Sequence, residues 1–431
     1  MRRFGRQLAL ILSVIVGFHL CGPLRSTPAA EPSVQSRQAS SGRKKVKKPS
    51  PVRRVSRRRT RPSSRYLRLD AALKNETRQA IAEDDLRGED PEVRRAVLDA
   101  MGDYAGTVVV MDPHTGRIYS IVNQRWALRK AFKPCSTIKL PVAVAGLSEG
   151  LIDPNALVPL GHRSPALNLT EALAQSNNRY FDVLGAQLGR EKIIAYAREW
   201  GLGSCTGINL PGEVPGKLPP EKLPASSRRR SSASPAAAVG LMASHGDGFE
   251  VTALQLAILT SALANGGYLY QPQVVRSEEE ARNFRPLLIR QLNLSEEHRR
   301  SIIAGMVGAV QYGTAKSAYD PAIPIAGKTG SCRNDTLWTG LFVSFAPVHR
   351  PQLVVVVITE GLGQRGPIAA QIAGRIYQRL AHRLADRPVA ESPASAATAL
   401  PSSSFARLSL QTLSWILSLL IRLSGPLGLF G

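Results

Sequence analysis

The chain has 431 residues, of which 43% are hydrophobic, enough for one large domain or two modest ones. Its formal net charge is +24, and residues 25–68 alone hold fifteen Lys or Arg against one acid, Glu31, a local charge of +14. A segment so highly charged repels itself and buries little apolar surface, which excludes a folded domain there and predicts a disordered basic Ser/Pro linker over residues 25–69.

We expect this basic linker to be a solvated spacer. Anionic lipid and anionic wall polymer are the alternative partners, because both attract a basic segment by the electrostatics through which such segments often bind nucleic acid. No nucleic-acid partner is expected.

Residues 1–24 have the order of segments found in a secretory signal. Three arginines precede an apolar run over residues 8–20, and small residues follow within 26–30. The run is short for a membrane span, although it would serve as an anchor if it extended to residue 24. We therefore expect a signal peptide or an N-terminal membrane anchor. The protein is then exported to the cell envelope, either to the periplasm or to the outer face of the cytoplasmic membrane.

Hydrophobic spacing predicts a folded domain over residues 70–385. Residues 71–102 read as two helices separated near Gly88 and Pro91, and residues 211–235 read as a Pro-rich loop. Further helices are predicted over residues 137–147, 171–188, 191–200, 253–264 and 369–384. Strands are predicted over residues 106–112 and 117–122, which form a hairpin, and over 324–330, 337–345 and 353–359.

Strands at both ends of the domain with helices between them indicate an α/β (α+β) fold whose sheet is completed by distant segments. Residues 386–431 are expected to be an Ala/Ser/Pro linker and an amphipathic C-terminal helix. Residues 408–423 would form this helix, which could lie at a membrane interface or bind a protein partner. The third alternative is that this segment is a poorly ordered tail.

Three short motifs occur in one order within this domain. They are an S-x-x-K, an S-x-N and a K-T-G followed by serine, formed by Ser136 and Lys139, by Ser176 and Asn178, and by Lys328, Thr329, Gly330 and Ser331. Each motif alone is more simply read as structure: a capped helix start, a polar helix edge, and a strand leaving into a turn. Their joint occurrence favours a catalytic interpretation.

The chemistry of serine catalysis explains these residue types. A serine hydroxyl is a poor nucleophile until a base takes its proton, and Lys139 lies one helical turn from Ser136. A free lysine has a pKa of about 10.4, so burial or a neighbouring cation such as Lys328 is needed to favour the neutral amine. Ser176 can pass a proton toward the leaving group. Asn178 can accept from Lys139 and donate to a substrate carbonyl.

The remaining groups suit an anionic substrate. Lys328, Thr329 and Ser331 offer a charge and two hydroxyls to a carboxylate, and the backbone N–H groups of Ser136 and Ser331 can form an oxyanion hole. The four cysteines form no CxxC pair and the seven histidines have no metal-ligand spacing, so neither a metal nor a cofactor is expected.

On these motifs the chain resembles the transpeptidase domain of penicillin-binding proteins, over roughly residues 105–380. Further stretches that resemble this family are 106–113, 210–216, 251–257, 313–315 and 338–347. The resemblance implies a central, mainly antiparallel sheet flanked by helices, with an all-helical subdomain. It also implies D,D-transpeptidase chemistry on the D-Ala-D-Ala end of a peptidoglycan stem peptide and acylation by β-lactams. Ser136 would be the nucleophile and Lys139 the base.

The chain departs from this family at Cys135, where the residue before the nucleophile is usually small, such as glycine. Cysteines are placed like Cys135 and Cys332 in carbapenem-hydrolysing class A β-lactamases, where they are bridged. The resemblance thus implies a Cys135–Cys332 disulfide, which an exported protein permits, and leaves Cys205 unpaired. The alternative is two unpaired small core residues.

Three functions remain open on the sequence alone. The first is a transpeptidase or D,D-carboxypeptidase, and the second is a β-lactamase on the same fold. Both acylate Ser136 and differ in whether water attacks the acyl-enzyme. The third is a non-catalytic sensor of β-lactams or wall peptides.

Overall fold

The computed structural model describes residues 63–161, 165–221, 234–334 and 337–385. The expected signal or anchor, nearly all of the basic linker, and the C-terminal segment over residues 386–431 lie outside these ranges. Among the described helices, none is both long enough and apolar enough to cross a membrane.

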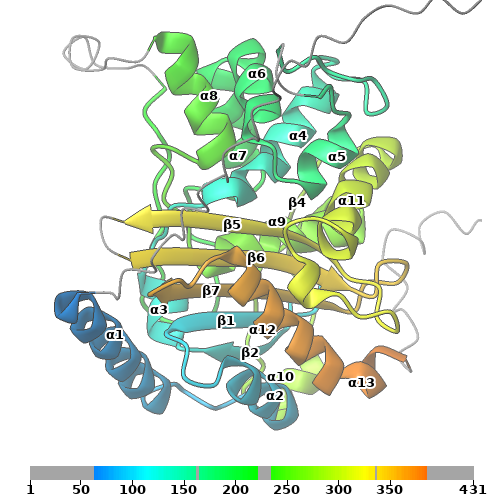
Figure 1. Cartoon of the computed structure of the whole chain (residues 1–431). Coiled ribbons are helices and arrows are strands. Elements are labelled where there is room, and N and C mark those ends of the chain that lie inside the picture. Colours follow the sequence, from blue (N-terminus) through cyan, green and yellow to red (C-terminus); the bar gives the residue numbers. More distant parts are fainter. Residues whose placement is uncertain (1–62, 162–164, 222–233, 335–336, 386–431) are drawn as a thin grey trace, which may run out of the picture. The chain divides into compact units, whose positions relative to one another are not determined.

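A five-stranded sheet in the order β2-β1-β7-β6-β5 is the centre of the fold, with every neighbouring pair antiparallel (Figure 1). Its strands are β1 Gly106–Met111, β2 Ile118–Val122, β5 Ala326–Asn334, β6 Leu337–Ala346 and β7 Leu353–Gly361. The predicted hairpin is confirmed in β1 and β2. The C-terminal strands complete the sheet beside β1, so the mainly antiparallel sheet is also confirmed.

Helices cover both faces of this sheet. In β1, Val109 belongs to the core on the side of α9 (Ala253–Asn265), whereas Val108 and Val110 belong to the core on the side of α2 (Pro91–Met101) and α12 (Gly366–Arg379). Because successive side chains of a strand point to opposite faces, a sheet covered on both sides needs the unbroken apolar runs seen in β1 and β7.

The all-helical subdomain lies on the β5 side of the sheet (Figure 1). Its helices are α4 Lys139–Ser148, α5 Leu169–Ala174, α6 Asn178–Leu188, α7 Arg190–Glu199, α8 Pro235–His245 and α11 Glu296–Gln311. The smaller elements are α3 Gln124–Arg129, η1 Cys135–Ile138, β3 Tyr268–Tyr270, α10 Glu278–Asn283, β4 Leu288–Gln291, η3 Lys316–Ala318 and α13 Ala381–Ala385. Strand β5 is therefore the boundary between the sheet and the helices.

The structure corrects two expectations and adds two helices of the subdomain that were not predicted. Helix α1 (Ser64–Ala82) begins inside the segment expected to be disordered up to residue 69. The single helix expected over residues 171–188 is two helices, α5 and α6, with a break between them. The unpredicted helices of the subdomain are α8 and α11, and α11 is its longest helix.

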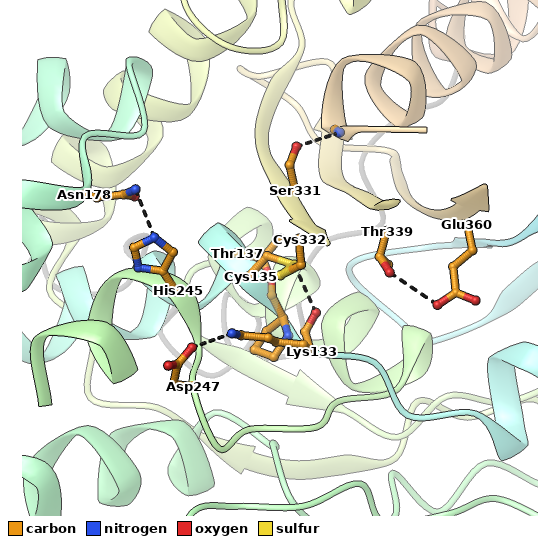
Figure 2. The surroundings of a disulfide bond; sticks show 12 residues. Lys133, Cys135, Thr137, Asn178, His245, Asp247, Ser331, Cys332, Thr339 and Glu360 are labelled. Carbon is orange, nitrogen blue, oxygen red and sulfur yellow. Dashed lines mark hydrogen bonds and ion pairs between the residues drawn. A yellow bond between two sulfur atoms is a disulfide. The ribbon is translucent and has the colours of Figure 1, made fainter. Parts of the chain in front are cut away.

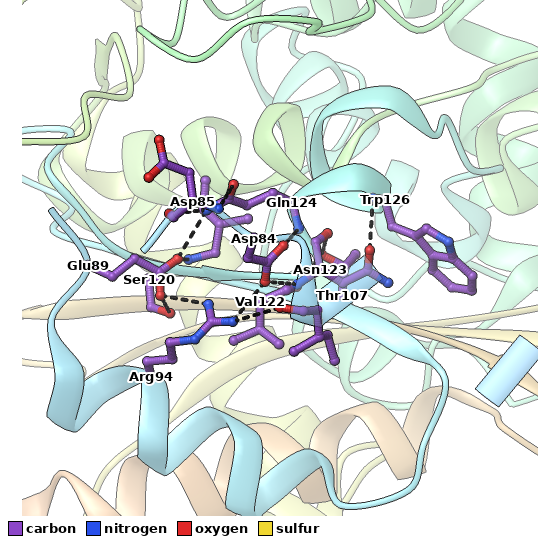
Figure 3. Close-up of polar contacts among 12 residues, drawn as sticks. Asp84, Asp85, Glu89, Arg94, Thr107, Ser120, Val122, Asn123, Gln124 and Trp126 are labelled. Carbon is purple, nitrogen blue, oxygen red and sulfur yellow. Dashed lines mark hydrogen bonds and ion pairs between the residues drawn. The ribbon is translucent and has the colours of Figure 1, made fainter. Parts of the chain in front are cut away.

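A buried ionic network joins the N-terminal helices to the sheet (Figure 3). The Asp84 carboxylate, which follows α1, accepts hydrogen bonds from Arg94 Nη2 at 3.0 Å and from the backbone N–H groups of Asn123 and Gln124 at 3.0 and 2.7 Å. Arg94 on α2 also donates to Glu89 at 2.8 Å. Buried charges are tolerated when they are paired and hydrogen-bonded in this way. The network explains why the domain extends to α1.

Candidate active site

Ser136 lies in η1, a 3-10 turn that leads directly into α4. The turn opens with Cys135 in the left-handed region, at φ 51°, a conformation that costs a non-glycine residue roughly 1–2 kcal/mol. Pro134 closes the turn by accepting from the Thr137 backbone N–H at 3.1 Å and from Thr137 Oγ1 at 2.7 Å. The positive φ explains why a small residue such as glycine suits the position before the nucleophile.

Lys139 follows one turn later and is fully buried. Within the described residues, its Nζ donates to Asn178 Oδ1 at 2.6 Å, to the Ser176 backbone oxygen at 2.7 Å and to Ser176 Oγ at 3.2 Å. Burial lowers the pKa of the Lys139 amine to about 7, although the nearby Asp182 carboxylate acts to raise it. A substantial fraction of this amine is therefore neutral near pH 7.

Ser176 sits in the break between α5 and α6, at φ 54°. The backbone N–H groups of Ser176 and Asn177 close the end of α5 on Leu173 and Ala172, and Asn177 then caps α6. If α5 and α6 were one continuous helix, the regular helical turn would fix the direction of the Ser176 side chain. The left-handed residue instead lets Ser176 and Asn178 both reach Lys139.

Lys328 on β5 is also fully buried, and its Nζ donates to Ser176 Oγ at 2.7 Å and to the Thr329 backbone oxygen at 3.1 Å. Burial, and then the nearby Lys139, lower its pKa well below the ordinary value. The sequence predicts that Lys328 presents a charge to a substrate carboxylate. Its amine lies against the Ser176 hydroxyl, so two lysine amines converge on one serine.

The residues of β5 divide between its two faces. Gly330 and Cys332 face the nucleophile turn: a Cβ on Gly330 would lie 3.0 Å from the Pro134 backbone oxygen. On the other face, Thr329 Oγ1 hydrogen-bonds Thr314 Oγ1 at 2.6 Å. Ser331 Oγ accepts from the backbone N–H of the first residue of α12 at 2.9 Å (Figure 2). The hydroxyls expected to bind a carboxylate thus lie together but are already hydrogen-bonded.

The family model described as "Penicillin binding protein transpeptidase domain" matches residues 106–378, which is more than half of the chain. The chain belongs to this family. All three motifs fall inside the match, as do the hydrogen bonds of Lys139 and Lys328 to Ser176.

Curated relatives share this family but are distant. The chain is 26% identical to "Peptidoglycan D,D-transpeptidase MrdA" of Acinetobacter baumannii over 388 residues, covering 74% of this chain and 54% of that protein. It is 26% identical to "Stage V sporulation protein D" of Bacillus subtilis over 302 residues, covering 62% of this chain and 45% of that protein. This transpeptidase-family chain thus spans about half the length of the curated relatives that it matches.

A solved structure agrees on the fold. The structure of Pseudomonas aeruginosa PBP2 in complex with WCK 5153 matches with a TM-score of 0.59 at 23% identity, covering 68% of this chain and 74% of that one.

In this transpeptidase fold, a disulfide between Cys135 and Cys332 joins η1 to β5, with the two Cα atoms 5.7 Å apart (Figure 2). It links the residue before Ser136 to the strand that carries Lys328, across a sequence separation of 197 residues. Cys205 is exposed and unpaired within the described part of the chain.

We expect reduction of this disulfide to lower the free energy of unfolding by about 2–5 kcal/mol, because a crosslink over a long loop restricts the unfolded chain. Urea unfolding of the oxidised and reduced protein measures the difference, and Cys205→Ser, tested in the same way, is the matched control. Alkylation of both Cys135 and Cys332 without reductant would show that the bond does not form.

His245 is a residue near the site that sequence reasoning missed. It is the last residue of α8, and its Nε2 lies 3.1 Å from Asn178 Nδ2 (Figure 2). No spacing rule connects Asn178 to His245, because their contact depends on how α8 packs on α6.

Within the described ranges, no group of three or more His, Cys, Asp or Glu side chains could hold a metal ion.

Proposed function

We propose that the chain is a penicillin-binding serine D,D-transpeptidase that acts on the D-Ala-D-Ala end of peptidoglycan stem peptides. The observation that carries the proposal is the convergence of two buried lysine amines on Ser176 Oγ, at 3.2 and 2.7 Å, beside the Ser136 turn. A low-pKa amine near a serine is the arrangement that nucleophilic acyl transfer needs. The name of the Acinetobacter baumannii relative, a peptidoglycan D,D-transpeptidase, supports the same activity.

Acylation would begin when neutral Lys139 takes the proton of Ser136 Oγ as that oxygen bonds to the carbonyl carbon of the penultimate D-Ala. The backbone N–H groups of Ser136 and Ser331 would hold the developing oxyanion. When the C–N bond breaks, Ser176 would pass the proton from Lys139 to the departing D-Ala nitrogen. Lys328, bonded to Ser176 Oγ, would orient this transfer.

Deacylation would follow the same path in reverse. An amine of a second stem peptide attacks the acyl carbon, its proton returns by way of Ser176 and Lys139, and Ser136 regains its hydrogen. Water in place of the amine would give D,D-carboxypeptidase activity. β-Lactams would acylate Ser136 by the same first step.

We also propose that the protein works in the cell envelope and is exported by residues 1–24 as a signal or a membrane anchor. The basic linker would be a solvated spacer, with binding to anionic lipid or wall polymer as the alternative. The disulfide beside the nucleophile supports an oxidising compartment. Subcellular fractionation tests this: recovery in the cytoplasm with reduced cysteines would contradict it.

The activity can be tested on the full chain by intact mass after addition of a penicillin, and by product analysis with a D-Ala-D-Ala pentapeptide and an amine acceptor. A lasting adduct together with a transfer product supports the transpeptidase. Release of D-Ala without transfer indicates a carboxypeptidase. Rapid loss of the adduct, with accumulation of hydrolysed drug, indicates a β-lactamase. The positions of Cys135 and Cys332, which resemble those of carbapenem-hydrolysing class A β-lactamases, favour this alternative. An adduct without any peptide turnover indicates a sensor, and no adduct contradicts the proposal.

A further inference from the structure

Two glycines let α6 and α8 cross closely beside the active site. A Cβ on Gly240 would lie 3.2 Å from Asp182 Cα, and a Cβ on Gly185 would overlap Ala243. Helices approach this closely only where small residues meet. The crossing places the end of α8, Ser244 and His245, against α6.

A continuous chain of hydrogen bonds runs from this crossing to Lys139. Asp182 Oδ1 lies 2.6 Å from Ser244 Oγ, which lies 2.6 Å from His245 Nδ1. His245 Nε2 lies 3.1 Å from Asn178 Nδ2. Asn178 Oδ1 then accepts from Lys139 Nζ at 2.6 Å. Asn178 is exposed and His245 is half-buried, so this series of hydrogen bonds connects the crossing of α6 and α8 to the exposed part of the candidate active site.

The direction of each hydrogen bond follows from its ends. Lys139 Nζ donates to Asn178 in both of its protonation states, because the one lone pair of the neutral amine is needed for the Ser136 proton. Asn178 therefore turns its oxygen toward Lys139 and its amide nitrogen toward His245. Nε2 must then accept, which leaves the proton of a neutral imidazole on Nδ1. Ser244 Oγ has a single hydrogen, which goes to Asp182 or to the Gly240 backbone oxygen at 2.9 Å, so it accepts from Nδ1.

We propose that His245, as the neutral Nδ1–H tautomer, is a positioning residue that holds Asn178 in its working orientation. The Asn178 oxygen stays on Lys139, and the second Nδ2–H stays free for the substrate carbonyl. This inference rests on the proposed function, because it assigns a task to His245 in the same acyl transfer.

The surrounding charges make this orientation sensitive to pH. His245 faces Lys139 on α4, Asp182 on α6, Asp247 after α8 and Lys133 before η1, and Lys133 and Asp247 are paired with each other (Figure 2). Burial, and next Lys139, lower the pKa of the His245 imidazole, so it is neutral at pH 7. At lower pH the imidazole takes up a proton on Nε2 and becomes an imidazolium, so Nε2 can only donate. Two donors then face each other, and Asn178 must turn or move.

The pH dependence of acylation by a fluorescent penicillin tests the inference. If one group must be unprotonated, the acylation rate falls about 10-fold per pH unit on the acid limb. If two groups must be unprotonated, it falls by up to about 100-fold per pH unit. We expect the wild type to fall more steeply than 10-fold per unit. His245→Gln keeps an acceptor that cannot titrate, so it should fall about 10-fold per unit. His245→Phe should be slower at every pH, by about 10-fold.

The matched control is His349→Gln, which makes the same substitution at an exposed histidine between β6 and β7 and should retain the wild-type profile. A second readout does not depend on activity: ¹⁵N NMR of the imidazoles, with His245 assigned from the signal lost in His245→Gln. The expected spectrum is that of an Nδ1–H tautomer. In Ser244→Ala, which removes the acceptor of this proton, the population should shift toward Nε2–H.

Superimposable acid limbs for the wild type and His245→Gln would overturn the inference, as would an Nε2–H tautomer in the wild-type protein. Either result is compatible with penicillin acylation at Ser136, so it leaves the proposed function in place. Absence of acylation in the wild type would remove the proposed function. The NMR result would then still decide whether the Asp182–Ser244–His245–Asn178 chain has the proposed direction.

Discussion

Ser136→Ala should abolish covalent acylation by penicillin while the protein remains folded. Removal of a nucleophile that works as a unit with its base lowers turnover by about 10⁴-fold or more. The substitution deletes one half-buried oxygen with no hydrogen bond that supports the fold among the described residues, so the free energy of unfolding should change by less than about 1 kcal/mol. Intact mass measures the adduct, and thermal unfolding measures the stability.

The matched control is Ser301→Ala on α11, whose hydroxyl donates only to the Glu297 backbone oxygen of its own helix at 2.9 Å within the described structure. This variant should form the adduct at the wild-type rate. An adduct of unchanged mass in Ser136→Ala would mean that another residue is the nucleophile, and peptide mapping of the adduct would find it.

Lys139→Met should lower the acylation rate by about 10³-fold and stabilise the fold at the same time, because a fully buried amine is replaced by an apolar side chain. With a pKa of about 7 in the folded protein, below the ordinary 10.5, the wild type binds fewer protons when folded. Its stability should therefore rise with pH between these values, and the cost of Lys139 is fully present below pH 7. The gain in Lys139→Met should be roughly 1–4 kcal/mol near pH 7 and should shrink toward pH 10.

The same pKa predicts the pH dependence of the wild-type reaction. The neutral amine accumulates as pH rises through about 7, so acylation should increase across that range and then level off. Lys192→Met is a matched control, because Lys192 is an exposed lysine on α7 paired with Glu149 and should retain both rate and profile. A wild-type rate in Lys139→Met, or a flat profile in the wild type, would rule out Lys139 as the base.

Local pattern was sufficient for several parts of the fold. The hairpin of β1 and β2 and the apolar helix α9 were predictable because apolar runs, turn residues and caps act over a few residues. Helix α11 was missed because Gly305 and Gly308 weaken its propensity. They are needed where a Cβ would strike Leu173 and Ala174. The continuous helix over residues 171–188 was wrong because its apolar spacing gives no sign of the left-handed Ser176.

Sequence pattern was enough to name the candidate site residues: a serine and a lysine one turn apart, and two further motifs of residue types suited to acyl transfer. The partner of each amine depends instead on packing between segments that lie far apart in the chain. Ser176 lies 37 residues from Lys139 and 152 residues from Lys328, yet its hydroxyl bonds to both. The crossing of α6 and α8 likewise brings His245 to Asn178, 67 residues away in the sequence. The physical reason is that composition and spacing fix what a side chain can do, whereas burial and packing between distant segments fix its pKa and its neighbours.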